Sequence, residues 1–147
     1  MSSENMPQPV SQIPQVGVAL LILNGPQVLL GRRLKSPMPG SWQLPGGWLH
    51  HGETCEQAVT RKVEEFPNMI CDQPRFVTYT NNRFAQGLHS VSLYFEMRCL
   101  SADQINLEQN KHCSDWFWAD WYDMPDSLFL PLSLLKSSGY QPFIPAV

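Results

Sequence analysis

The chain has 147 residues, which is enough for one ordinary domain with a hydrophobic core and too few to expect two. Its 10 basic and 13 acidic residues give a formal net charge of −3, so the chain as a whole does not attract nucleic acid or an anionic membrane. No apolar run reaches the roughly 18 residues that span a bilayer. We therefore expect neither a membrane partner nor binding in a DNA groove, and any phosphate binding must be local.

The first residues lack the charged-then-apolar order of a secretory signal. We expect residues 1–15 to form a flexible arm and residues 16–147 to form a single domain. The cysteines show no CxxC pair, which argues against a zinc ribbon or a disulfide framework. Reduced thiols in a cytoplasmic protein are the expectation for all of them: Cys55, Cys71, Cys99 and Cys113.

The first half of the chain predicts several strands and one helix. Residues 16–23 form a nearly continuous apolar run, and 27–33 would be the returning strand after an NGP turn. Residues 34–41 predict a loop, and 42–48 a short strand broken by a bend at the two glycines. A helix should begin at Thr54, whose spacing to Gln57 matches a capping box, and end near Phe66 before a proline.

The second half adds strands and a closing helix. Alternating residues at 75–80 and 89–100 predict two strands joined by a turn at 81–87, and 116–120 predicts another short strand. Residues 126–139 predict a helix with Pro131 in its first turn and Gly139 at its C-terminal cap. The pattern as a whole indicates a mixed α/β class without internal repeats.

The mid-chain helix has an apolar stripe interrupted by one charge. At 100° per residue the stripe consists of Cys55, Ala58, Val59, Val63 and Phe66. Lys62 projects from the same stripe, where its ammonium group needs water, a carboxylate or a bound anion as partner. Glu65 lies at the edge of the stripe, three residues after Lys62.

The run Gly47-x5-Glu53-x7-Arg61, preceded by LPGG, resembles the Nudix box, whose pattern is G-x5-E-x7-R-E-U-x-E-E-x-G-U with U apolar. Val63 and Met69 match the two U positions. The resemblance covers residues 17–143 and is strongest to the nucleoside triphosphate diphosphatase subgroup of MutT-type Nudix hydrolases. It implies an α/β/α sandwich with a mixed sheet, nucleotide pyrophosphohydrolase activity, Mg²⁺ or Mn²⁺ as cofactor, and a homodimer.

The box is degenerate at the metal-binding carboxylates. The resemblance implies three glutamates at positions that read Lys62, Glu65 and Phe66 here, so one carboxylate remains. Magnesium prefers oxygen ligands, and a lysine ammonium adds positive charge where the metal would lie. The family's further acid should fall near Cys113 or Ser114, with Asp115 one residue away.

Position 50, where the family usually has glutamate, holds a histidine. His50 is either a surface imidazole or a ligand, and with His51 it would suit a softer metal such as Zn²⁺ or Ni²⁺.

The resemblance defines a set of candidate site residues. The candidate catalytic residues are Glu65, Glu53 and Arg61, the last two as a bracing ion pair. The candidate substrate-binding residues are Gly46, Gly47, Lys62, Arg32, Arg33 and His50. If a metal binds, its ligands would be Glu65 and Gly47.

Three hypotheses follow. The chain is a binding module that has lost most or all hydrolase activity, in which Lys62 stands in for the metal and holds a nucleoside phosphate. Alternatively, it is a working Mg²⁺-dependent pyrophosphohydrolase with a rearranged site that uses Glu65, Glu53 and either Asp115 or Glu108. A third hypothesis is a protein-interaction role, in which a cluster of aromatic residues forms the contact surface. Core packing and base stacking are the alternative roles for the same cluster. The cluster is Trp116, Phe117, Trp118 and Trp121.

Overall fold

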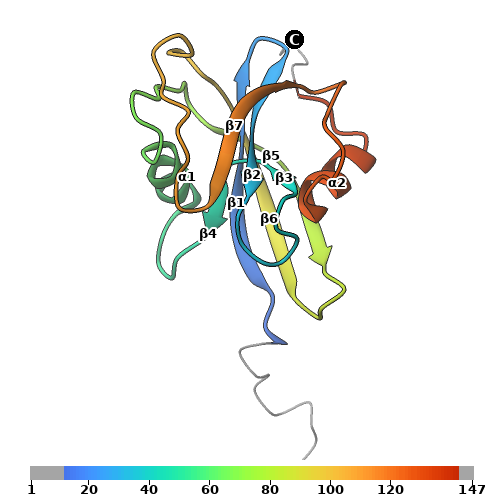
Figure 1. Ribbon diagram of the computed structural model, residues 1–147. Coiled ribbons are helices and arrows are strands. Elements are labelled where there is room, and N and C mark those ends of the chain that lie inside the picture. Colours follow the sequence, from blue (N-terminus) through green and yellow to red (C-terminus); the bar gives the residue numbers. More distant parts are fainter. Residues whose placement is uncertain (1–11, 143–147) are drawn as a thin grey trace, which may run out of the picture.

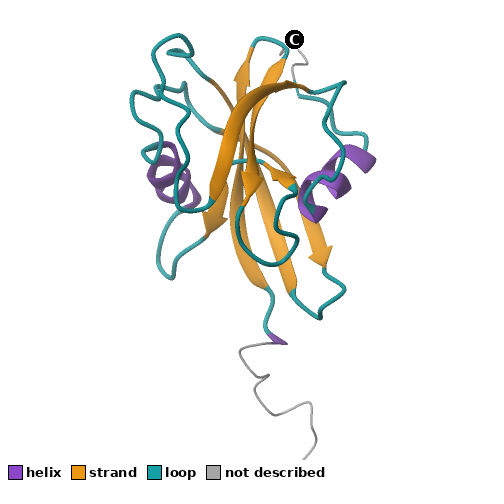
Figure 2. Cartoon of the chain, viewed as in Figure 1, coloured by secondary structure: helices purple, strands orange, loops and turns teal. Residues whose placement is uncertain are grey.

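The computed structural model describes residues 12–142, which form a curved mixed sheet between two helices (Figures 1 and 2). Helix α1 (Cys55–Val63) covers one face of the sheet, and helix α2 (Leu130–Ser137) covers the other. The strands in chain order are β1 (Gln15–Asn24), β2 (Gln27–Arg33), β3 (Trp42–Gln43), β4 (Gly46–Trp48), β5 (Arg75–Arg83), β6 (His89–Arg98) and β7 (Cys113–Asp120). The predicted α/β/α sandwich is confirmed.

Strand β1 is the centre of the sheet. The main strand order is β3-β2-β1-β6-β5, with β4 also paired to β1 and β7 to β2. β1 and β6 run parallel from Gln15↔Ser90 to Leu23↔Arg98, whereas the other strand pairs are antiparallel. A central strand covered on both faces must be apolar on both, which explains the continuous apolar run. Leu20 and Leu21 accordingly point to opposite faces and are both fully buried.

Alternate side chains divide the core into two layers. The layer under α1 contains Leu20, Ile22 and Val59, and the layer under α2 contains Leu21, Leu23 and Leu135. The aromatic run of β7 follows the same alternation. Trp116 belongs to the first layer and Trp121 to the second, with exposed fractions of 6% and 1%. A contact surface built on these two tryptophans is therefore wrong, because both are core residues.

The short strand predicted at 42–48 is interrupted at Leu44–Pro45, not at the glycine pair. Gly46 and Gly47 lie inside β4 and pair with β1. The reason is steric, because a Cβ on Gly46 would lie 2.3 Å from the carbonyl oxygen of Val18. Glycine is needed there so that two backbones can approach closely.

Helix α1 begins as predicted but ends earlier. Thr54 is the N-cap of a complete capping box with Gln57. The helix ends at Val63, and Glu65 and Phe66 lie in the turns that follow. Pro67 explains the early end, because a proline ring clashes with the carbonyl group four residues earlier, which is that of Val63. The N–H groups of Glu65 and Phe66 instead donate to the carbonyls three residues back, those of Lys62 and Val63. The position of Glu65 relative to Lys62 is therefore set by a turn.

Several bounds predicted for the second half of the chain are wrong, including the end of the strand predicted at 89–100, which is Arg98. β5 extends to Arg83, so the predicted turn at 81–87 is wrong, and the connection is 84–88. Asn82 stays in the strand because its amide donates to the hydroxyls of Ser90 and Ser92 on β6. β7 starts three residues earlier than the predicted strand at 116–120. The closing helix is shorter than predicted, with Pro131 in its first turn as expected and Ser138 as the cap residue before Gly139 at φ +84°.

The predicted arm, residues 1–15, lies mostly outside the described residues, and β1 already begins at Gln15. Within residues 12–142, no helix is both long and apolar enough to cross a bilayer.

Candidate functional site

The loop before α1 is fixed to the helix by the predicted Glu53–Arg61 ion pair. Arg61 donates to the two Glu53 carboxylate oxygens at 2.9 and 3.1 Å, and to the carbonyl oxygen of Trp48 at 2.9 Å. The backbone N–H of His50 donates to Glu53 at 3.0 Å. The hydrogen bond from Arg61, followed by that from His50, lowers the pKa of Glu53 to about 2. The pair therefore holds the loop's shape with Glu53 ionised.

Lys62 is buried and ion-paired. Its exposed fraction is 5%, and its ammonium group contacts the carboxylate of Glu65. The sequence left water, a carboxylate or a bound anion open as the partner, and the structure shows the carboxylate. The interpretation in which the ammonium group extends to solvent is therefore wrong. The glycine at 47 makes room for this arrangement, because a Cβ there would lie 3.2 Å from three atoms of the Lys62 side chain. Gly47 thus accommodates a lysine in this structure.

His112 completes a small charged group with Lys62 and Glu65. Its Nε2 lies 3.6 Å from a carboxylate oxygen of Glu65. Burial, followed by the positive charge of Lys62, lowers the pKa of His112, whereas Glu65 acts in the opposite direction. The side-chain oxygen of Asn110 accepts the backbone N–H groups of His112 and Cys113, both at 2.9 Å, which fixes the turn that presents the histidine.

These side chains surround a cavity of about 10 Å³, which is space for roughly one water molecule. The remaining lining residues are Gln43, Pro45, Gly46, Phe66 and Trp116. Phe66 packs edge-on against Trp116, with ring centroids 4.9 Å apart. The Nε1 of Trp116 is a buried donor without a hydrogen-bond partner among the described residues. A buried indole N–H usually has a partner, so this orphan donor marks a place for a water or ligand oxygen.

The two predicted phosphate-binding arginines support a neighbouring loop. Arg33 donates to the carbonyl oxygens of Ser36 and Pro37 at 2.9 and 2.7 Å, and its guanidinium lies over the Phe129 ring. Its third hydrogen bond, 2.8 Å to Gln43, reaches a residue that lines the cavity. Arg32 is exposed and donates to Gly40 at 3.3 Å while its guanidinium lies over the Trp42 ring. Neither arginine lines the cavity itself.

The remaining candidate ligands do not line the cavity. Cys113 is fully buried, and desolvation raises the pKa of its thiol to about 12. Asp115 is exposed and accepts a hydrogen bond from Ser114, and neither it nor Glu108 lines the cavity. His50 is exposed and outside the cavity as well.

No group of three or more His, Cys, Asp and Glu side chains in residues 12–142 is arranged to hold a metal ion. The site as built has a single carboxylate, Glu65, and that carboxylate is already engaged by an ammonium group.

Sequence reasoning missed Asn110, His112, Gln43 and the indole N–H of Trp116. The aligned position after the late lysine drew attention to Cys113 and Ser114, whereas the residue facing the site is His112. The available signal was Asn110, because an asparagine two residues before a histidine favours a side-chain-to-backbone turn.

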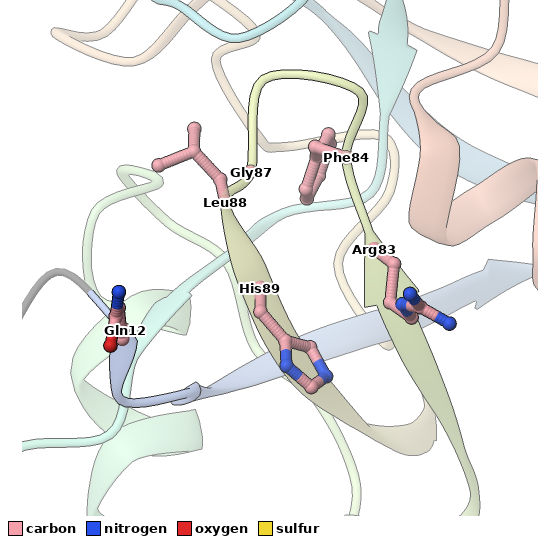
Figure 3. A pocket seen from close by; sticks show the side chains of 6 residues that line it. All are labelled: Gln12, Arg83, Phe84, Gly87, Leu88 and His89. Atoms are coloured by element: carbon pink, nitrogen blue, oxygen red, sulfur yellow. The ribbon is translucent and has the colours of Figure 1, made fainter. Parts of the chain in front are cut away.

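A larger hollow of about 540 Å³ lies at the end of the β5–β6 hairpin and shares no lining residue with the site (Figure 3). Arg83 and His89 come from the two paired strands, and Gln12 comes from the segment before β1. The hollow is wide open, and we assign it no ligand.

Comparison with known proteins identifies the family. The NUDIX domain model matches residues 13–143, so the chain belongs to the NUDIX family. The RNA pyrophosphohydrolase of Blochmanniella floridana is 32% identical over 133 residues, covering 78% of this chain and 81% of the relative. The ADP-ribose pyrophosphatase of Methanocaldococcus jannaschii is 39% identical over 57 residues, and this match spans only 39% of this chain and 34% of the relative.

Solved structures agree with the fold. A MutT NUDIX hydrolase from Burkholderia pseudomallei superposes with a TM-score of 0.73 at 25% identity, covering 84% of this chain and 97% of the other. The NUDIX domain of Shewanella oneidensis NrtR, solved in complex with ADP ribose, has a TM-score of 0.67 at 24% identity, with coverage of 95% and 97%. The fold and family of the chain are therefore established.

Proposed function

We propose that this NUDIX protein binds a nucleoside phosphate without cleaving it efficiently. The observation behind the proposal is the buried Lys62–Glu65 ion pair, which lies where the family resemblance implies metal-binding glutamates. A lysine ammonium is a compact positive charge and binds phosphate well. It cannot, however, activate a water molecule as a divalent metal does.

The residues present do not fit Mg²⁺ or Mn²⁺. Such cations need several oxygen ligands, and here one carboxylate faces an ammonium group. The positive charges of Lys62 and, when protonated, His112 would repel a cation. The proposed binding accordingly does not depend on a metal ion.

The same site suits an anion. Lys62 and the Trp116 indole are hydrogen-bond donors only, and the indole N–H has no partner among the described residues. The side chain of Glu65 is 24% exposed and that of Lys62 is 6% exposed, so the carboxylate lies on the solvent side of the pair. Because the cavity holds only about one water, a phosphate oxygen would reach Lys62 by displacing Glu65.

The comparisons suggest which nucleotides to test. The NrtR NUDIX domain was solved with ADP ribose, a nucleoside diphosphate derivative, and two relatives are named for pyrophosphate cleavage of ADP ribose and RNA. We propose a nucleoside diphosphate or triphosphate as the ligand class of this chain.

Calorimetric titration of ADP ribose, ADP and ATP in the presence of EDTA tests the proposal. Wild type should bind at least one of them. Lys62→Met should weaken binding at least tenfold, and Glu65→Gln should strengthen it, because the competing carboxylate loses its charge. Lys111→Met, next to His112 but exposed, is the matched control. Absence of binding by wild type, or equal affinities of wild type and Lys62→Met, would contradict the proposal.

A second candidate function is favoured by the similarity to an RNA pyrophosphohydrolase over most of its length. In that case Glu65 would hold a metal after release from Lys62, with Glu53 and Asp115 or Glu108 as further ligands. Pyrophosphate or phosphate release from nucleotides and from a 5′-triphosphorylated RNA, with Mg²⁺ or Mn²⁺, would reveal this activity. Loss of this activity in Glu65→Gln would support a hydrolase function over binding alone.

We propose a homodimer, as the subgroup resemblance implies, and light scattering of the purified chain measures the mass directly. The cytoplasm is the proposed location, in keeping with four free cysteines.

A further inference from the structure

Two cysteines face each other where the segment that follows α1 runs beside the end of β6. Residues 67–72 run beside the end of β6, where the N–H of Asp72 donates to the Arg98 carbonyl at 3.0 Å and the N–H of Leu100 to the Ile70 carbonyl at 2.7 Å. Between these two hydrogen bonds, Cys71 and Cys99 form an isolated antiparallel bridge. The two residues are far apart in the sequence but lie directly opposite each other in this bridge.

The flanking hydrogen bonds identify Cys71–Cys99 as a non-hydrogen-bonded pair. In such pairs the Cα atoms are about 4.5 Å apart and the side chains lie close together. A disulfide needs a Cα separation of roughly 4.4–6.8 Å, so this backbone position meets the requirement. Both side chains also pack against the same core layer, which places them on one face.

The surrounding contacts hold the two chain segments together at the bridge. The Ser101 hydroxyl donates to the Asn68 carbonyl at 2.7 Å and accepts the Ile70 N–H at 2.9 Å. The Arg98 guanidinium pairs with Asp72 at 2.8 Å on the other side of the bridge. Both thiols are free and only partly buried. Fixed geometry of this kind favours an intramolecular reaction over competing ones.

We propose that Cys71 and Cys99 form a reversible disulfide when the chain meets an oxidised low-molecular-weight thiol such as glutathione disulfide. The site is independent of the proposed nucleotide binding.

The exchange proceeds in two steps. The Cys99 thiolate attacks one sulfur of glutathione disulfide, which forms a mixed disulfide and releases one glutathione thiolate that takes up the proton lost by Cys99. Cys71 then loses its proton to water and attacks the Cys99 sulfur, and the second glutathione leaves as a thiol. The two protein thiols lose two electrons, and glutathione disulfide gains them.

The order of the steps follows from the environment of Cys71. Burial, followed by the nearby Cys99, raises the pKa of Cys71 to about 12, which makes the Cys71 thiol a poor nucleophile for the first attack. Once Cys99 is in a mixed disulfide it has no thiolate charge, and this part of the effect on Cys71 disappears.

The bridge should be visible in stability. It would close a loop of roughly 30 residues in the unfolded chain, and chain-entropy arguments then predict a rise in Tm of about 10 °C. It would also tie the segment after Glu65 and Phe66 to β6.

The experiment equilibrates the purified full chain in a series of reduced and oxidised glutathione ratios, blocks free thiols with N-ethylmaleimide, and maps the digest by mass spectrometry. A peptide linked through Cys71 and Cys99, two free thiols left unlinked, and the raised Tm are the expected results. Cys71→Ser and Cys99→Ser should each abolish the linked peptide and the Tm rise, whereas Cys55→Ser should retain both.

Two results would overturn the proposal. One is a folded wild-type chain in which, at the most oxidising ratio, Cys71 and Cys99 are still free and are alkylated by N-ethylmaleimide, or carry glutathione without forming the link. The other is a link from either residue to Cys55, to Cys113 or to another chain. Circular dichroism of each serine variant confirms that it is folded, so loss of the bridge is attributable to the missing thiol.

Discussion

Neutralising Glu65 should destabilise the protein much more than removing the charge of Lys62. In Glu65→Gln the buried ammonium loses its carboxylate, and leaving one member of a fully buried ion pair costs about 3–5 kcal/mol. Because a quarter of the Glu65 side chain is exposed and water can partly replace it, we expect about 2–3 kcal/mol here. That loss corresponds to a fall in Tm of about 8 °C.

Lys62→Met should instead be neutral or stabilising by about 1 kcal/mol, since an apolar side chain of similar shape suits the buried stripe. The Lys62→Met, Glu65→Gln double variant should resemble Lys62→Met, which gives a coupling energy of about 2 kcal/mol. Urea unfolding followed by tryptophan fluorescence measures all three, with the exposed neighbour Glu64→Gln as control, expected within about 0.5 kcal/mol of wild type. Equal effects of Glu65→Gln and Glu64→Gln would refute the reasoning.

Three further predictions concern the same region. The pKa of Glu53 falls from an unfolded value near 4.5 to about 2, so Glu53 contributes stability that is present above pH 4.5 and is lost as the pH falls through 2. Urea unfolding between pH 6 and pH 2 should therefore show that the free energy of unfolding of Glu53→Gln depends less on pH than that of wild type. Lys62→Glu with Phe66→Glu should gain Mn²⁺-dependent pyrophosphate release over a silent wild type, at a stability cost of about 3–5 kcal/mol for the lost ring; a variant that folds and stays silent would argue against an otherwise intact site. Gly31→Ala should cost about 1–3 kcal/mol in urea unfolding, because its Cβ would lie 2.6 Å from the Trp116 ring, and an unchanged midpoint would contradict this packing.

The sequence predicted the sheet strands well where the apolar pattern was strong. The strand 27–33 was predicted with its exact bounds, and the capping box at Thr54 was found in place. These features depend on neighbouring residues, so local pattern suffices to predict them. The predicted element boundaries next to Pro45, Asn82 and Pro67 were wrong. Pairing with a distant strand decides the first two, and the steric limits of proline decide the third.

The family motif located the Glu53–Arg61 brace and raised the question of Lys62 from spacing alone. The sequence by itself determined that two of three expected carboxylates are missing, since residue identity is independent of folding. Only the tertiary structure decided what replaces them. The turn after Val63 returns Glu65 to Lys62. The pairing of β7 with β2 brings His112, the residue just before β7, from nearly fifty residues away to the same carboxylate. Local sequence contains no information about such a meeting, because the distance between residues remote in the chain is fixed by sheet register and core packing.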